Sequence, residues 1–338
     1  MPQPTWFAES LPILIEGNEL PAALMVDAIR AMASGPVDDA QAAAFLIALR
    51  IKGETAREIG AAVGVLREKM VRIERPAGTI LDTCGTGGDG SGTFNISTAV
   101  ALIVAATGCP VVKHGNRSVS SRSGSADVLA ELGVPIERGP TWAQSCLDRF
   151  GFAFCFAPQF HPALAHIGPL RRKLGTRTIF NLLGPLLNPA SAECQLLGVG
   201  RLELLDPLAG AASLLGIHRA FLVCADDGLD EVSLAAPTQV RWVCGHDIEK
   251  LRWTPANFGL EPCRIEDLKA DGPKESAGII LHILAGEGGP HERIVLANAA
   301  AALLVVGKVG SLLEGVAAAR QAIGNGAAKR LLEQLCAS

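Results

Sequence analysis

Apolar residues recur at helical spacing from the N-terminus to residue 72 of the 338-residue chain. Between Met25 and Met32 they fall on one face of a predicted helix, which Gly35 ends. Capping boxes at Asp38 and at Thr55 predict the beginnings of two further helices. Because no strand pattern interrupts these helices, we expect residues 1–75 to form a small helical domain.

From Thr79 onward, short apolar runs alternate with helix-like stretches. Such runs are typical of a mostly parallel central sheet that helices cover on both faces. We therefore predict the α/β fold class, with an α/β domain over residues 76–338. Between Pro237 and Lys274 we expect only short strand candidates and turns. The predicted strands are Thr79–Cys84, Pro110–Val112, Phe152–Ala157, Cys194–Val199 and Ala220–Ala225. The clearest helices are Ser97–Thr107, Ser125–Leu132, Ala297–Leu304 and Leu312–Ile323.

Two loops rich in glycine and hydroxyl residues follow the first two predicted strands. The first, Gly85–Thr98, has the sequence GTGGDGSGTFNIST, and the second, Lys113–Ser121, has the sequence KHGNRSVSS. Each loop leads toward a predicted helix, so backbone N–H groups and a helix N-terminus meet there, an arrangement that binds anions. Two such loops in tandem predict a ligand that carries phosphate at both ends.

The first loop also has the spacing of two other phosphate motifs. Gly85, Gly87 and Gly90 satisfy the dinucleotide fingerprint, which needs an acidic residue about 20 residues further on. The second strand instead leads into Lys113 and His114. The ATP-binding loop needs a lysine where this chain has Ser91. The remaining alternative, a pair of ordinary glycine-rich turns, is common for one loop and unusual for two.

Composition limits the class of protein. With 49% hydrophobic and 19% charged residues, the chain has the composition of a soluble enzyme with a sizeable core. A net charge of −4 provides no basic field for nucleic acid, and no apolar segment is long enough for a membrane span. The N-terminus lacks the basic start of a secretory signal. Nine scattered cysteines without metal or redox spacing indicate a reducing cytoplasm.

Together with two further stretches, the loops resemble the signature of the anthranilate phosphoribosyltransferase family. The further stretches are RRKLGTRTIFN at Arg171–Asn181, continuing to Gly184-Pro185-Leu186, and DGLDEVS at Asp227–Ser233. The similarity extends from about Leu20 to the end of the chain, in the family's order and spacing.

The resemblance implies a nucleoside-phosphorylase-like phosphoribosyltransferase fold, in which residues 162–182 rejoin the N-terminal helices. It implies an enzyme that transfers the phosphoribosyl group of phosphoribosyl pyrophosphate to the amine of anthranilate, in tryptophan biosynthesis. It also implies a homodimer that forms through the helical domain.

The residues of the loops suit such a donor. Glycines let the backbone approach phosphate oxygens, while Asn95 and Ser97 lie at a helix start, where capping and anion binding are compatible. Lys113 can neutralise a phosphate as a point charge, although a solvated lysine is the commoner case. The resemblance implies donor contacts at Gly85, Gly88, Asp89, Thr93, Asn95, Ile96, Ser97, Thr98, Lys113, His114, Gly115, Asn116, Arg117, Ser118, Val119, Ser120, Ser121 and Ser125.

We expect magnesium beside these loops. Asp230 and Glu231 are adjacent carboxylates after the last predicted strand. Such a pair is usually only solvated, but Mg²⁺ is typically held by one or two carboxylates together with substrate phosphate. The resemblance implies metal ligands at Ser97, Asp230 and Glu231, and two magnesium ions. Asp226 and Asp227 depart from the family pattern, and two effects stay open: tighter Mg²⁺ binding or repulsion of pyrophosphate.

A carboxylate acceptor would suit the basic run that begins at Arg171. Guanidinium groups bind carboxylates as a planar fork, which makes Arg171 and Arg172 candidates, although an exposed basic helix face would look the same. The resemblance implies acceptor contacts at Gly85, Asn116 and Arg171. We expect His114 to be a structural histidine bonded to backbone, and we assign no general acid or base, because an arylamine is already neutral at pH 7.

Two other functions are weighed. A pyrimidine-nucleoside phosphorylase would need one phosphate site and a nucleobase pocket, whereas Arg171 and the acidic pair favour a carboxylate acceptor and a metal. A catalytically silent relative that binds nucleic acid would show degraded glycine loops and a basic surface. This chain has intact loops and net negative charge.

Overall fold

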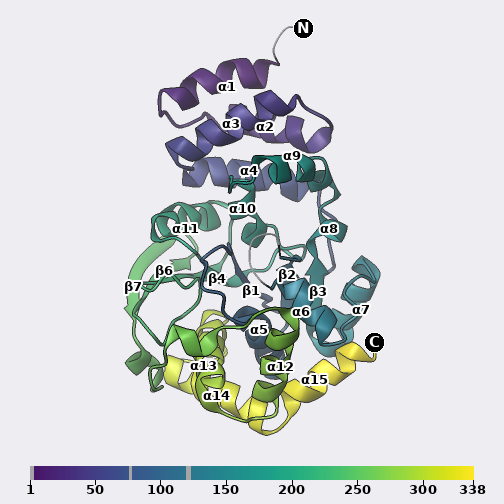
Figure 1. The fold of residues 1–338 in the computed structure, drawn as a ribbon, viewed down its shortest axis with the longest axis vertical. Coiled ribbons are helices and arrows are strands. Elements are labelled where there is room, and N and C mark those ends of the chain that lie inside the picture. The colour runs from purple at the N-terminus through teal and green to yellow at the C-terminus, as the bar shows by residue number, and fades with distance from the viewer. Residues whose placement is uncertain (1–3, 76–77, 119–122) are drawn as a thin grey trace.

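The computed structural model describes residues 4–75, 78–118 and 123–338. N-terminal helices form a layer at one end of the molecule, a sheet lies in the middle, and C-terminal helices cover the other end (Figure 1). The N-terminal helices are α1 (Thr5–Ile15), α2 (Ala22–Ser34), α3 (Asp39–Lys52) and α4 (Ala56–Glu68). Both predicted helix starts are confirmed: Asp38 accepts the amide of Gln41, and Thr55 with Glu58 forms a complete capping box.

The sheet has seven strands in the order β3-β2-β1-β4-β5-β6-β7. The strands are β1 (Leu81–Gly85), β2 (Val111–Gly115), β3 (Phe152–Phe156), β4 (Cys194–Gly198), β5 (Arg219–Ala225), β6 (Thr238–Cys244) and β7 (Asp247–Trp253). β1 to β5 run parallel, whereas β6 and β7 add an antiparallel hairpin at one edge. The predicted α/β class and the five predicted strands are confirmed, with shifted ends, and the hairpin falls where only short strand candidates were expected.

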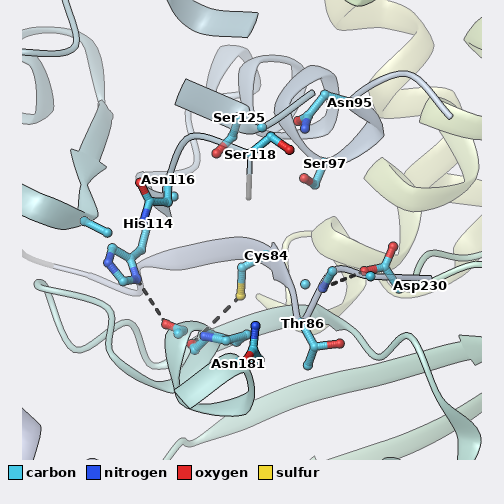
Figure 2. A pocket seen from close by; sticks show the side chains of 18 of the residues that line it. Cys84, Thr86, Asn95, Ser97, His114, Asn116, Ser118, Ser125, Asn181 and Asp230 are labelled. Atoms are coloured by element: carbon cyan, nitrogen blue, oxygen red, sulfur yellow. Dashed lines mark hydrogen bonds between the residues drawn. The ribbon is translucent and has the colours of Figure 1, made fainter. Parts of the chain in front are cut away.

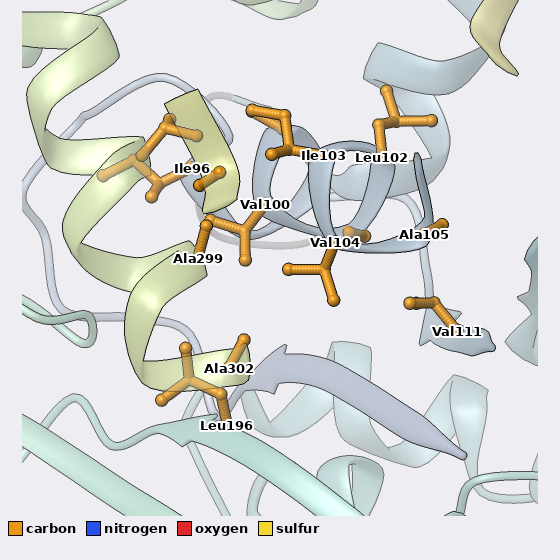
Figure 3. Close-up of a cluster of buried hydrophobic side chains, with 14 of the residues drawn as sticks. Ile96, Val100, Leu102, Ile103, Val104, Ala105, Val111, Leu196, Ala299 and Ala302 are labelled. Atoms are coloured by element: carbon orange, nitrogen blue, oxygen red, sulfur yellow. The ribbon is translucent and has the colours of Figure 1, made fainter. Parts of the chain in front are cut away.

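Two apolar helices, α5 (Ile96–Ala106) and α13 (Gly289–Val305), fill one face of the sheet. Figure 3 shows Val100 and Val104 of α5 gathered with Ala299 and Ala302 of α13 near Leu196 of β4. Complete burial of a valine or leucine contributes about 1.5–3 kcal/mol, so this packing fixes the start of α5, where the first loop ends. Although α13 is mostly apolar from Ile294 to Val305, no helix in the described ranges is both long and apolar enough to cross a membrane. Around these two helices pack α12 (Pro273–Leu284), α14 (Leu312–Gly324) and α15 (Ala327–Cys336).

On the opposite face, α11 (Leu205–Leu214) packs between the sheet and α4. α9 (Gly168–Leu174) lies against α3, and α10 (Phe180–Leu183) lies against α4, so this later segment returns to the N-terminal layer (Figure 1). One hydrophobic cluster extends from the N-terminal helices onto the sheet. Because the core does not divide near residue 75, the domain boundary there stays a prediction.

The direction of winding reverses between β1 and β4. The chain passes from β1 through α5 to β2 on one side, and from β4 through α11 to β5 on the other. In open α/β sheets, ligands bind at such a switch point, beyond the carboxyl ends of the strands. Gly85 and Gly198, the last residues of β1 and β4, are partners in the sheet register at this point.

Candidate active site

A cavity of about 360 Å³ opens at the switch point. Figure 2 shows Asn95, Ser97, Ser118 and Ser125 gathered along one wall, across the cavity from Thr86. The described residues of both predicted phosphate loops contribute to the lining of this one cavity, together with the acidic pair and Arg171. The structure thus joins features that lie more than a hundred residues apart in the sequence.

The first loop is built from glycines and a helix cap. Gly87 and Gly88 have φ of 62° and 72°, a left-handed conformation that favours glycine. At the end of the loop, the Asn95 side chain caps α5 by accepting the amide of Thr98 (3.2 Å), as predicted. The amide of Asn95 itself donates to Oγ of the buried Ser276 in α12 (2.8 Å). The loop is therefore anchored at the point where Asn95, Ile96 and Ser97, at the start of α5, line the cavity.

Lys113 lies beneath the loops, in β2. Its side chain is 2% exposed, and Nζ donates to Oγ of Ser97 (3.0 Å) and to the carbonyl of Thr83. Burial lowers the pKa of Lys113, an effect that the nearby carboxylate of Asp82 opposes. Lys113 thus places positive charge under the N-terminus of α5, and its predicted contact with phosphate stays a prediction.

Two buried histidines form the floor beside Lys113. The ring centroids of His114 and His161 lie 4.8 Å apart, and Nδ1 of His114 lies 3.1 Å from the carbonyl oxygen of Gly184, the backbone contact expected from the sequence. Burial lowers the pKa of His114 to about 3 and that of His161 to about 4. Both imidazoles are therefore neutral near pH 7, and neither is a proton donor in the imidazolium form.

The acidic pair lies directly against the ends of β1 and β4. Oδ2 of Asp230 accepts the amide of Gly87 (3.0 Å), and a Cβ at Gly85 would lie 2.9 Å from the same oxygen (Figure 2). Burial, reinforced by the charge of Asp89, raises the pKa of Asp230 to about 7. Burial and the neighbouring Asp230 also raise the pKa of Glu231, an effect that Lys113 opposes. Two carboxyl groups whose ionised forms burial disfavours thus face the phosphate loops.

The two acids that depart from the family pattern point to partners of their own. Asp226 forms an ion pair with Arg252 (3.2 Å) and accepts from Gln239 (2.9 Å), both in the β6–β7 hairpin. Oδ2 of Asp227 accepts from the hydroxyl of Ser233 (2.7 Å). Their charge thus helps to fix the turn that carries Asp230 and Glu231, and both effects considered from the sequence stay predictions.

Arginines from the α9–α10 segment form the remaining wall. Arg171 lines the cavity, with its guanidinium 5.9 Å from the ring centroid of Phe180, whereas Arg172 is exposed. Partial burial lowers the pKa of Arg171 and of Arg177. Arg177 donates to the carbonyl of Thr86 (2.8 Å), where it occupies the space that a side chain at Gly88 would need.

Sequence reasoning assigned no role to Arg177 or to His161. Arg177 lies within the basic stretch Arg171–Asn181. Its contact with Thr86 forms only because the fold brings this stretch to the first loop, which the sequence does not reveal. His161 carried no local signal, since only the fold brings it to His114.

Most predicted donor residues do meet at the cavity. Thr98 is fully buried behind the wall, and Arg117 pairs at the rim with Asp127 (3.1 Å) and Glu137 (2.6 Å). Val119, Ser120 and Ser121 lie outside the described residues. The predicted residues that line the cavity are Gly85, Gly88, Asp89, Thr93, Asn95, Ile96, Ser97, Lys113, His114, Gly115, Asn116, Arg117, Ser118, Ser125, Arg171, Asp230 and Glu231.

Comparison with known proteins places this geometry in a family. The glycosyl transferase family a/b domain matches residues 77–329, and the helical bundle domain of the same family matches residues 9–70. The anthranilate phosphoribosyltransferase of Desulfitobacterium hafniense (strain Y51) is 46% identical over 330 residues, 98% of each chain. That of Symbiobacterium thermophilum is 46% identical over 320 residues, 95% of this chain and 94% of the relative.

Solved structures agree over the same span. The anthranilate phosphoribosyltransferase of Thermus thermophilus superposes with a TM-score of 0.90 at 41% identity, covering 97% of this chain and 98% of that one. The Saccharomyces cerevisiae enzyme in complex with PRPP and Mg also gives 0.90, at 29% identity, covering 98% of this chain and 97% of that one. The chain therefore belongs to the anthranilate phosphoribosyltransferase family of glycosyl transferases.

Proposed function

We propose that this chain transfers the 5-phosphoribosyl group of phosphoribosyl pyrophosphate to the amine of anthranilate and releases pyrophosphate, a step of tryptophan biosynthesis. The observation that carries this function is the meeting of two phosphate loops, a buried acidic pair and Arg171 in one cavity. Yeast relatives have been solved in complex with PRPP and Mg and in complex with 4-fluoroanthranilate.

The acidic pair fits a magnesium ion that substrate oxygens help to hold. Within the described residues, no group of three or more His, Cys, Asp or Glu side chains is arranged as a metal site of its own. Two carboxylates completed by water and phosphate are the usual setting for Mg²⁺, and the raised pKa of Asp230 shows how poorly its charge is compensated by protein groups alone. Ser97, Asp230 and Glu231 would hold the metal, and two ions are part of the proposal. When bound, magnesium supplies charge neutralisation for the departing pyrophosphate.

The chain's own residues position the donor. The glycine loop and the start of α5 line the cavity and would bind one phosphate end, and Lys113 adds positive charge beneath Ser97. Ser118 in the second loop and Ser125, the first residue of the helix that follows, would provide donors for the other phosphate end. Donors fixed in advance by the fold stabilise charge that develops as the bond to pyrophosphate breaks.

Arg171 would hold the carboxylate of anthranilate and so direct the amine toward the anomeric carbon. A C–N bond forms there while the C–O bond to pyrophosphate breaks, the electron pair leaves with pyrophosphate, and the amine loses one proton to solvent. His114 and His161 stay neutral and shape the floor. No general base is assigned, because the lone pair of an arylamine is free at pH 7.

The remaining expectations about the whole enzyme are also proposals. We propose a homodimer that forms through the helical domain, drawn from the family resemblance, and a cytoplasmic location, drawn from the scattered cysteines. Two domains, residues 1–75 and 76–338, would close on the cavity that the α9–α10 segment borders.

Loss of anthranilate fluorescence tests the function directly. With phosphoribosyl pyrophosphate and Mg²⁺ present, we expect a decay that requires all three components and scales with enzyme concentration. If fluorescence stays constant at high enzyme concentration while thymidine and phosphate yield thymine, the nucleoside phosphorylase alternative replaces this proposal.

A further inference from the structure

One amide is buried in the otherwise apolar stretch Ile294–Val305 of helix α13. Asn298 is completely buried and lies in the sequence LANAAAALL. Its Oδ1 accepts the amide of Val232 (2.8 Å), and its Nδ2 donates to the carbonyl of Val232 (2.9 Å) and to that of Ile294, one turn earlier (2.9 Å). Val232 directly follows Glu231 in the sequence. The Asn298 side chain, from one of the C-terminal helices, thus forms hydrogen bonds with the backbone next to the acidic pair.

The chemistry of this position argues for more than packing. An amide in an apolar core is costly unless its bonds are made, and asparagine is a poorer helix former than the alanines around it. Here both polar atoms are bonded, and two of the three bonds go to one residue. Holding both the N–H and the C=O of Val232 fixes the position and the rotation of the preceding peptide, and with it the direction of the Glu231 side chain.

Hydrogen bonds of Asp227 also stabilise the turn before Val232. Oδ1 of Asp227 accepts the amide of Leu229 (3.1 Å), and Oδ2 accepts from the Ser233 hydroxyl, which closes the turn upon itself. Gly198 permits close approach, because a Cβ there would collide with the carbonyl oxygen of Asp230. The acidic pair therefore sits in a segment that several contacts hold in place, and the bonds of Asn298 tie its backbone to a buried helix.

We propose that Asn298 is a positioning residue that sets Asp230 and Glu231 in the geometry needed to bind Mg²⁺ with the donor. This inference rests on the proposed function, which places the metal at those carboxylates. Residues that orient metal ligands typically change metal affinity by 10–100-fold when replaced, although they touch neither metal nor substrate. Asn298 is such a residue, reached through the backbone of Val232.

The test compares two core variants of the full-length chain. Asn298→Leu keeps the number and branching of the side-chain heavy atoms and removes all three bonds, whereas Leu296→Ala damages the same buried helix at a residue with no polar bond to the turn. Binding of Mn²⁺, a spectroscopic substitute for Mg²⁺, is measured by electron paramagnetic resonance with phosphoribosyl pyrophosphate and without anthranilate. Thermal unfolding of each variant is recorded alongside.

We expect Asn298→Leu to weaken Mn²⁺ binding at least about tenfold, while Leu296→Ala stays within about twofold of the wild type despite a comparable loss of thermal stability. Equal affinity in Asn298→Leu and wild type, or equal weakening in both variants, would make Asn298 a core residue only. Should Asn298→Leu not fold, the shorter Asn298→Ser is expected to weaken Mn²⁺ binding in the same direction, and unchanged binding overturns the proposal. A wild-type protein that binds no Mn²⁺ with the donor refutes the metal site itself, a result distinct from one confined to the variants.

Discussion

Replacement of Arg171 by alanine is the sharpest probe of the acceptor side, because the chain offers a matched control next to it. Arg171 lines the cavity and lies over Phe180, whereas Arg172, with the same charge and the same helix, is exposed. A hydrogen bond to a charged partner contributes about 1.5–3 kcal/mol, and each 1.4 kcal/mol changes an affinity about tenfold. Arg171→Ala should therefore raise the KM for anthranilate about 10–100-fold.

Steady-state kinetics with each substrate varied in turn separates the sites. The KM for phosphoribosyl pyrophosphate should change less than about twofold in Arg171→Ala, and Arg172→Ala should leave both KM values near the wild type. Arg171→Lys should fall between, since an ammonium group lacks the planar fork. Equal effects of Arg171→Ala on both substrates, or an equal effect of Arg172→Ala on anthranilate, would remove Arg171 from the acceptor site.

Three further predictions concern the metal, the glycines and the buried histidines. Asp230→Asn should raise the Mg²⁺ concentration for half-maximal rate at least about tenfold, and an unchanged Mg²⁺ titration would argue against ligation. Gly198→Ala should lower kcat, because the new Cβ would displace Asp230. Gly278→Ala, where the added Cβ meets open space, should leave kcat unchanged. Equal kcat values for the two variants would contradict the close packing at Gly198. Burial keeps His161 neutral and lowers its pKa to about 4. Between pH 6.5 and pH 4, the unfolded chain therefore binds a proton at His161 that the folded chain does not, so the free energy of unfolding decreases as the pH is lowered. His161→Asn should remove up to about 3 kcal/mol of that pH dependence in urea unfolding, and an unchanged slope would refute it.

The parallel part of the fold is readable from the sequence because burial on both faces leaves continuous apolar runs. The β6–β7 hairpin is harder to predict, since the edge strand β7 exposes charged residues such as Glu249 and Lys250 that interrupt the alternation. Charged edges are common because they prevent strands from pairing with other chains. The strand's position therefore depends on its neighbour β6 more than on its own pattern.

The phosphate loops are likewise local features, and their spacing already indicates an anion site. Lys113 shows where local reasoning ends, because lysine is ordinarily exposed and only the packing of α5 over β2 explains its burial. Asn298 gives no sign of a role either, since its partner Val232 is 66 residues away in the sequence. Residues that act through tertiary contacts become visible only in the folded chain.

The central claim is that one cavity joins donor and acceptor so that pyrophosphate leaves only when the amine of anthranilate replaces it. Phosphorus magnetic resonance of a mixture of enzyme, Mg²⁺ and phosphoribosyl pyrophosphate measures this directly. Addition of anthranilate should convert the donor signals to pyrophosphate and a new phosphoribosyl monoester in equal amounts. Pyrophosphate release at the same rate without anthranilate, or no release with it, would contradict the account.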